Sequence, residues 1–143
     1  MAEHRYTLTP SRRARRDTDE IYRYTLRNYG ADAADNYNRL LRQAYIDISA
    51  DPFRPGSKER HEIGANVRSF HISLSKTRAK SSVKSPRHFV IYFLPKENEV
   101  LVARILHDAQ DLARHVPRTG LGEPPENAVF REPKTPERGG QER

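Results

Sequence analysis

The spacing of apolar residues changes once along this chain of 143 residues, and that change limits the possible folds more than any other feature. Between Ala33 and Ile48 the apolar residues recur every three or four positions, as on one face of an α-helix. From Val67 onward they alternate with polar residues, as in strands that bury one face. We therefore expect an α+β protein, with helices in its first half and a sheet built mainly from its second half.

Residues that start and stop helices define the elements of the first half. Residues 4–10 predict a short strand because apolar and polar side chains alternate there. Ser11 is expected to cap a helix that Gly30 ends, since glycine adopts the left-handed conformation at little cost. Asp32 is expected to cap a second helix, which Pro52 stops. The two helices would form a hairpin joined at one glycine.

The second half predicts three strands and one short helix. The strands are expected over residues 67–74, 88–94 and 100–107. Asp108 can then cap a short helix that Pro117 ends. The resulting order is β-α-α-β-β-β-α. This order predicts a helical hairpin packed on one face of a small antiparallel sheet.

The alternation also assigns side chains to the two faces of the sheet. The residues predicted to face the core are Phe70, Ile72, Leu74, Phe89, Ile91 and Phe93. His71, His88 and Tyr92 are predicted to share the opposite, open face. Both registers of the last strand place apolar residues in the core, so either Arg104 or His107 can join that open face.

The composition separates a domain from a tail. The segment that starts at Pro117 holds five prolines and four glycines. Such a composition favours disorder, because few of its residues can be buried. We predict a domain over residues 1–117 and a disordered, charged tail over residues 118–143.

Several classes of protein do not fit the sequence. The chain has no cysteine, which excludes disulfides and thiolate zinc sites. No apolar run approaches the roughly 20 residues of a membrane span, and the N-terminus lacks the apolar core of a secretory signal. No histidine spacing resembles a pair of metal ligands on one helix or loop. We expect a cytoplasmic protein with no metal and no cofactor.

The positive charge is concentrated in one part of the sequence. The formal net charge is +7. Residues 63–96 contain seven basic residues and no acidic residue, so the rest of the chain is neutral. If this segment folds compactly, it predicts one positive patch for a charged partner, and otherwise it is a solvated loop. The basic residues are Arg68, Lys76, Arg78, Lys80, Lys84, Arg87 and Lys96.

Four stretches of the sequence together resemble a known family. They are RILHDAQDLARHV, VRSFHISL, PRHFVIYFL and the helical pattern that runs from Ala14 through Gly30 to Leu41. With the order of elements, they resemble the ParE branch of the RelE/ParE superfamily of type II toxin-antitoxin toxins. The resemblance covers about Tyr6 to Val116, which is nearly the whole predicted domain.

The resemblance implies a bacterial toxin that a cognate antitoxin binds and neutralises. For ParE toxins it further implies inhibition of DNA gyrase by binding, without catalytic residues, without a membrane partner, and with nucleic acid reached only indirectly or through the complex. Residues on the expected positive surface and on the last helix are then candidates for contacts with the target or the antitoxin. These candidates are Arg68, His71, Lys76, Arg78, Lys80, Lys84, Arg87, His88, Tyr92, Arg104, His107 and Leu112.

Two other functions are alternatives. Members of the RelE type cleave messenger RNA on the ribosome, which needs acid-base groups and cations at the scissile phosphate. This chain has no tyrosine after Tyr92, and His115 and Val116 stand where some nucleases of the superfamily have a His-Tyr pair. The third possibility is a basic module that binds nucleic acid, although no motif of that class is present.

Overall fold

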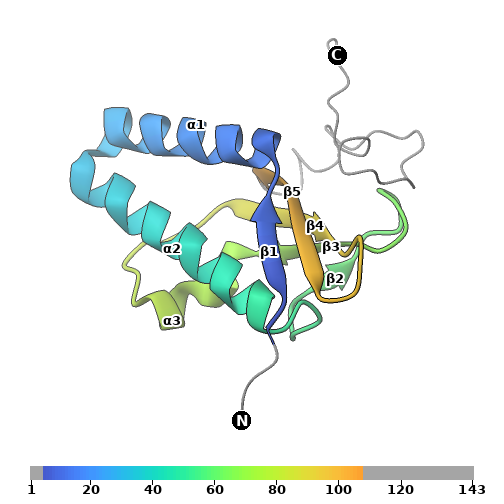
Figure 1. The fold of residues 1–143 in the computed structure, drawn as a ribbon. Helices are drawn as coiled ribbons and strands as arrows, with labels where there is room; N and C mark the ends of the chain where they lie inside the picture. Colours follow the sequence, from blue (N-terminus) through green and yellow to red (C-terminus); the bar gives the residue numbers. More distant parts are fainter. Residues whose placement is uncertain (1–4, 108–143) are drawn as a thin grey trace.

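The computed structural model of this protein describes residues 5–107. The predicted last helix, with Asp108 and Leu112, and the predicted tail lie outside these residues. The described part is an α+β fold in which two long helices lie beside a five-stranded sheet (Figure 1). The fold class is thereby confirmed. In chain order the elements are β1 (Thr7–Pro10), α1 (Arg12–Tyr29), α2 (Ala31–Ala50), β2 (Lys58–Glu59), β3 (Val67–His71), the 3-10 turn η1 (Ile72–Ser75), α3 (Lys76–Ala79), β4 (His88–Phe93) and β5 (Glu99–His107).

The sheet is mixed rather than wholly antiparallel, which corrects one detail of the prediction. Its strand order is β1-β5-β4-β3-β2. β3, β4 and β5 form the predicted antiparallel meander, whereas β1 pairs with β5 in parallel, with Thr7 opposite Glu99. Parallel neighbours need a long crossover connection. Here the three α-helices, η1 and the three strands between β1 and β5 provide it.

Helix α1 begins and ends for the reasons that the sequence suggested, whereas α2 begins without its predicted cap. Ser11 caps α1, because its side-chain oxygen accepts a hydrogen bond from the backbone N–H of Ala14 at 2.9 Å. Gly30 ends α1 with a φ of 96°, a conformation that favours glycine. It also directly precedes α2, so the helices meet at one residue (Figure 1). Asp32 lies inside the first turn of α2 and is not its cap.

Apolar side chains pack on both faces of the sheet. The larger cluster lies between the helices and the sheet and includes Leu40, Ile48, Phe70 and Tyr92. A second cluster lies on the other face, where Ile63 packs with side chains of the central strands. The sheet therefore has no open face at its centre. Within the described residues, no helix combines the length and apolar composition that crossing a membrane requires.

This two-sided packing reverses the predicted faces of β4. In an antiparallel pair, residues directly opposite each other lie on the same face. Phe70 is opposite Val90, so Val90 and its next-but-one neighbour Tyr92 face the helices. His71 is opposite Phe89, on the other face. The prediction that His71, His88 and Tyr92 share one face is therefore wrong. When a strand is apolar on both sides, its sequence does not show which side chains face the helices.

The strand predicted to continue to Leu74 ends at His71. The next residues form η1 and α3, within the basic segment 63–96 that the sequence analysis described as either a compact patch or a solvated loop. The hydroxyl of Ser75 donates a hydrogen bond of 2.6 Å to the buried carboxylate of Asp47 on α2, which draws the chain toward the helices. Leu74 is consequently 52% exposed rather than in the core.

A β-bulge joins the sheet to the start of α1. Ile91 is opposite Arg104 and Tyr92 is opposite Val102, so Ala103 has no partner on β4. The hydroxyl of Ser11 donates a hydrogen bond to the carbonyl oxygen of Ala103 at 2.9 Å. One serine thus both caps α1 and holds the bulge of β5.

Candidate functional site

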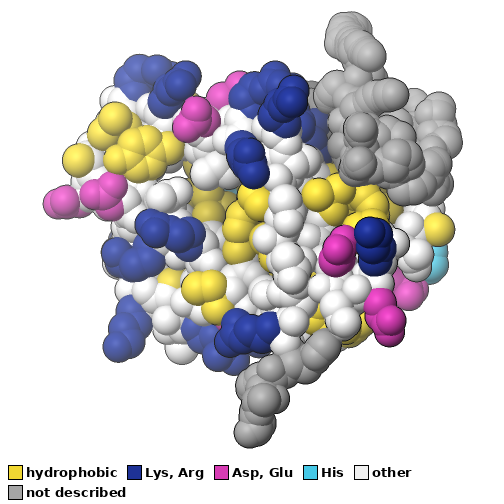
Figure 2. All heavy atoms as spheres, in the orientation of Figure 1, with side chains coloured by type: hydrophobic (Ala, Val, Ile, Leu, Met, Phe, Trp, Pro, Cys, Tyr) yellow, Lys and Arg dark blue, Asp and Glu magenta, His cyan; other side chains and the backbone are white. Residues whose placement is uncertain are grey.

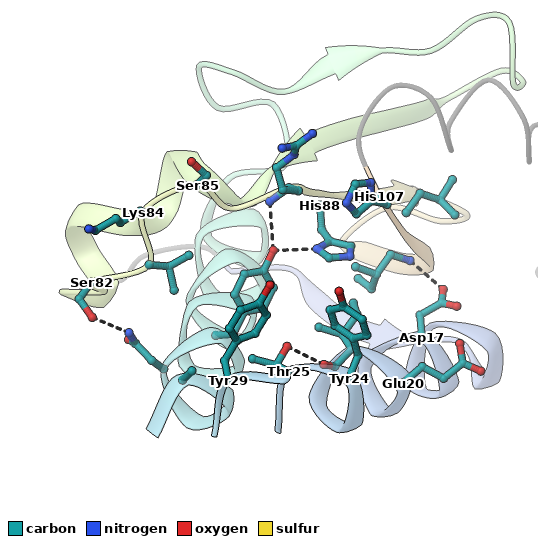
Figure 3. A pocket seen from close by; sticks show the side chains of 18 of the residues that line it. Asp17, Glu20, Tyr24, Thr25, Tyr29, Ser82, Lys84, Ser85, His88 and His107 are labelled. Atoms are coloured by element: carbon teal, nitrogen blue, oxygen red, sulfur yellow. Dashed lines mark hydrogen bonds between the residues drawn. The ribbon is translucent and has the colours of Figure 1, made fainter. Parts of the chain in front are cut away.

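A groove of about 1110 Å³ lies beside the two long helices (Figure 3). Its walls come from α1, the first half of α2, the segment 82–88 and the end of β5. The groove is large enough for several side chains of a partner, since ligand pockets commonly range from about 300 to 1,000 Å³. Because its walls come from distant parts of the sequence, the tertiary fold alone creates it.

A hydrogen-bonded chain crosses the groove between α2 and β4. The hydroxyl of Tyr37 accepts a hydrogen bond from the backbone N–H of Arg87 at 3.1 Å. It lies 2.7 Å from Nδ1 of His88. The hydroxyl can donate to Nδ1 of a neutral His88 or accept from a protonated Nδ1, because it keeps a second lone pair after accepting from Arg87.

His88 and His107 stand opposite each other on β4 and β5. Their ring centroids are 5.1 Å apart, and the rings are nearly perpendicular. Figure 3 shows both rings side by side at the groove. His107 is exposed and His88 is half-buried, so a partner in the groove can reach this pair.

Helix α1 gives the groove an aromatic wall. Tyr24 is 55% exposed and Tyr29 is 69% exposed, and both line the groove together with the apolar Ile21. The two tyrosine rings meet edge to face, with centroids 6.4 Å apart. Figure 3 shows both side chains reaching from the helix into the groove. Exposed tyrosines are typical of the residues that dominate protein interfaces, because they bury a large area with few rotatable bonds.

Basic groups lie on the opposite wall of the groove. Lys84 and Arg87 are exposed and line it from the segment before β4. Three acidic groups, Asp17, Glu20 and Asp32, line it from the helices. The groove can therefore receive an amphipathic peptide segment. Its apolar side chains would lie on the tyrosines, and its carboxylates would lie near the basic wall.

Arg104 is held in the fold by hydrogen bonds, whereas His107 is exposed at the groove. Its guanidinium is buried and donates two hydrogen bonds to the carboxylate of Asp17 on α1, at 2.8 and 3.1 Å. The backbone N–H of Ile105 donates a third bond to the same carboxylate at 2.9 Å. Every one of these contacts holds β5 against α1.

The remaining candidates do not form one surface with the groove. Arg68 lies near β2, where it donates to Ser57 and stacks on Phe53 at 5.0 Å. Tyr92 is fully buried, and its hydroxyl donates to the carbonyl oxygen of Pro52 at 2.6 Å. The prediction that Tyr92 lies on an open face is therefore wrong.

The other candidates divide between the far face of the sheet and α3. His71 contacts Phe89 edge to face on the far side of the sheet, with ring centroids 4.7 Å apart. Lys76, Arg78 and Lys80 belong to α3 and its end, which pack on α2. Of the predicted residues, the structure thus brings Lys84, Arg87, His88, Arg104 and His107 together at the groove. Leu112 is outside the described residues.

The sequence analysis did not identify the groove tyrosines or Asp17. Tyr37 fits the apolar stripe of its helix, and only the fold turns its hydroxyl toward His88. Asp17 stands among arginines, so it resembles one more solvated charge of the helix surface. Among residues 5–107, no three side chains of the metal-binding types come together to hold an ion.

Comparisons with known proteins identify a family for the sequence and a similar fold. A family model described as "ParE toxin of type II toxin-antitoxin system, parDE" matches residues 8–112. A solved chain of a chromosomal ParDE toxin-antitoxin system from P. aeruginosa is similar to this one. The two share 15% sequence identity and a TM-score of 0.55, over 74% of this chain and 99% of that chain. No curated protein matches the sequence.

A second solved structure is the toxin-antitoxin complex RelBE2 from Mycobacterium tuberculosis. One of its chains is 22% identical over 73% of this chain and 93% of its own length, with a TM-score of 0.44.

Proposed function

This chain belongs to the family of ParE toxins of type II toxin-antitoxin systems, and from that membership we propose that it inhibits bacterial DNA gyrase by binding to it. The match of the family model over residues 8–112 carries the proposal. According to this proposal, the toxin acts in the cytoplasm, catalyses no reaction, needs no cofactor, and is neutralised by a cognate antitoxin.

The groove supports the proposal that a cognate antitoxin binds and neutralises the toxin. A segment of the antitoxin with apolar side chains would cover Tyr24 and Tyr29, which are too exposed to contribute to the core. Acidic side chains of the same segment would pair with Lys84 and Arg87 across the groove. Antitoxin binding would then bury the aromatic wall and the His88–His107 pair together.

The gyrase proposal is tested with the purified chain and plasmid DNA. We expect loss of supercoiling and accumulation of cleaved DNA, while a translation reaction with the same preparation stays intact. Addition of the antitoxin should restore supercoiling. Full supercoiling at a large excess of toxin would contradict the proposal.

The antitoxin site is tested with the double variant Tyr24→Ala and Tyr29→Ala. Each aromatic hot-spot residue contributes about 2 kcal/mol or more, so the loss of both should lower affinity by roughly 700-fold if the two contributions add. Phe53→Ala is the matched control, because Phe53 is 53% exposed and lies outside the groove. Equal losses for the double variant and the control would place the antitoxin elsewhere.

One observation favours message cleavage as a second candidate function. The Tyr37 hydroxyl, His88 and His107 form a row of groups that can exchange protons, with the cations of Lys84 and Arg87 on the same groove. In ribonuclease chemistry one such group removes the proton of the ribose 2′-hydroxyl, and another protonates the leaving 5′-oxygen. If messages are cut in the translation reaction and gyrase is unaffected, this function replaces the first. His88→Gln and His107→Gln are then the first variants to measure.

A further inference from the structure

Helix α1 has an outer face built largely of arginine. Five arginines fall within about a third of the helix circumference, since 3.6 residues make one turn. This arginine face consists of Arg12, Arg15, Arg16, Arg23 and Arg27, all of them exposed. It points away from the buried Ala14 and Asp17. Figure 2 shows these basic side chains along the top of the molecule, over α1.

The arginine face is electrostatically unfavourable for the isolated protein. The first turn of α1 contains no acidic residue, although the positive end of the helix dipole favours acids there. Arg12 stands one turn before both Arg15 and Arg16, where like charges repel each other. None of these three arginines forms an ion pair with another side chain within residues 5–107. Their charge therefore serves no contact that stabilises the described fold.

The end of the sheet around β2 carries positive and negative charges that compensate each other. Around β2, basic and acidic residues alternate, and Arg60 pairs with Glu62 at 3.5 Å while Arg68 lies 3.8 Å from Glu59. The turn before β5 likewise combines Lys96 with Glu97. On α1, by contrast, five exposed arginines share one face with a single acid, Asp19, among them. The positive charge of this face is therefore less compensated than the charge around β2.

The spacing and chemistry of this face fit the phosphate backbone of duplex nucleic acid. From Arg12 to Arg27 the row is about 22 Å long, at 1.5 Å per residue. Over that length one strand of a duplex presents about six phosphates, one per 3.4 Å. Leu26 is the single apolar side chain among the arginines. The row thus lacks the apolar centre of a protein interface and the aromatic platforms that stack unpaired bases.

We propose that the arginine face of α1 binds the backbone of double-stranded DNA without reading its sequence. The choice of DNA over duplex RNA rests on the proposed function, because gyrase holds duplex DNA. Binding through this face would add an electrostatic contact with that DNA, separate from the groove on the other side of α1. The proposed antitoxin groove and the DNA contact are thus served by different faces of the same helix.

The test is the binding of the full-length chain to a labelled random-sequence DNA duplex at several salt concentrations. In the variant Arg12→Gln, Arg15→Gln and Arg16→Gln, the slope of log affinity against log salt should fall by about one for each lost phosphate contact. The control variant Arg5→Gln, Lys58→Gln and Lys96→Gln loses the same charge at exposed positions away from α1. It should keep the slope of the original chain within one unit. The variant Arg12→Lys, Arg15→Lys and Arg16→Lys should retain most of the affinity.

Three results would overturn the proposal. They are equal losses in the arginine and control variants, no loss in the arginine variant, and tighter binding to duplex RNA than to DNA. Thermal melting checks that the arginine variant remains folded, and the lysine variant gives an independent reading if it does not. Gyrase inhibition by the unchanged chain is measured separately with plasmid DNA. A failure of the gyrase proposal can therefore be told apart from a failure of the DNA-binding proposal.

Discussion

The inner and outer faces of α1 use charged side chains in opposite ways. On the inner face, the buried carboxylate of Asp17 accepts hydrogen bonds from Arg104 and from the backbone of β5. On the outer face, Arg12, Arg15 and Arg16 are exposed and form no ion pair with another described residue. The comparison shows that burial and partners, rather than residue type, separate a charge that holds the fold from one that is free to bind.

The largest effect should come from breaking the inner ion pair. Asp17→Asn removes the carboxylate that accepts two hydrogen bonds from the buried guanidinium of Arg104, and breaking such a buried pair typically destabilises a protein by about 3–5 kcal/mol. We expect urea denaturation to show a loss of that order. Asp19→Asn is the control, because Asp19 lies on the exposed side of the same helix, where such changes stay within about 0.5 kcal/mol.

A double variant sharpens this result. In Asp17→Asn combined with Arg104→Met, no buried charge is left unpaired, so the double variant should be more stable than Asp17→Asn alone. Simple addition of two losses in the denaturation curves would mean that the two side chains act independently. The inner face would then owe its stability to something other than this pair.

The second largest effect should be a loss of stability at alkaline pH caused by Tyr45, which lies on α2 near α1. Burial raises the pKa of Tyr45 to about 12. In the unfolded chain its pKa is 10.0, so the unfolded state releases its proton first as the pH rises. The contribution to stability is complete below pH 10 and is lost between pH 10 and about 12. At about 1.4 kcal/mol per pKa unit, the shift of about two units corresponds to roughly 3 kcal/mol.

The measurement is denaturation over this range of pH, with Tyr45→Phe beside the unchanged chain. The variant should lose less stability between pH 10 and 12, although burial also raises the pKa of Tyr92, and part of the loss should remain. Tyr24→Phe alters an exposed ring on α1 and should leave the alkaline loss unchanged. An identical alkaline loss in Tyr45→Phe and the unchanged chain would exclude this tyrosine as the cause.

A smaller effect is expected where the two faces of α1 begin. Ser11→Ala removes the cap of the helix and the hydrogen bond to the bulge at Ala103. Loss of a serine cap usually lowers the free energy of unfolding by about 1 kcal/mol, and the second bond should bring the loss toward 2 kcal/mol. Ser11→Thr retains a hydroxyl and should recover most of the loss in thermal denaturation.

The smallest effect should be an increase in stability rather than a loss. The triple glutamine variant at Arg12, Arg15 and Arg16 relieves repulsion within the helix and with its dipole. We expect the free energy of unfolding to rise by about 0.3–1 kcal/mol at low salt, and the gain to shrink as salt is added. A marked decrease in stability would show that these arginines do support the fold.

Local patterns determined the elements of this protein. The apolar stripe of α2, the cap at Ser11 and the stop at Gly30 act within a few residues of the chain, so their meaning can be read without knowing the fold. The alternation in β3 and the apolar runs of β4 and β5 likewise identified the meander. The family was also recognised from such stretches, because they follow one another in the same order.

The tertiary structure decided which side chains meet. β4 is apolar on both faces, so only its register with β3 shows that Tyr92 is buried. The bulge at Ala103 shifts the strand by one residue, and only then does Arg104 reach Asp17, 87 positions away. The groove combines Tyr24 with His88 and His107 from elements that are distant in sequence. Helix and strand patterns are local, whereas register, bulges and grooves depend on contacts between remote segments, and a sequence pattern does not contain those contacts.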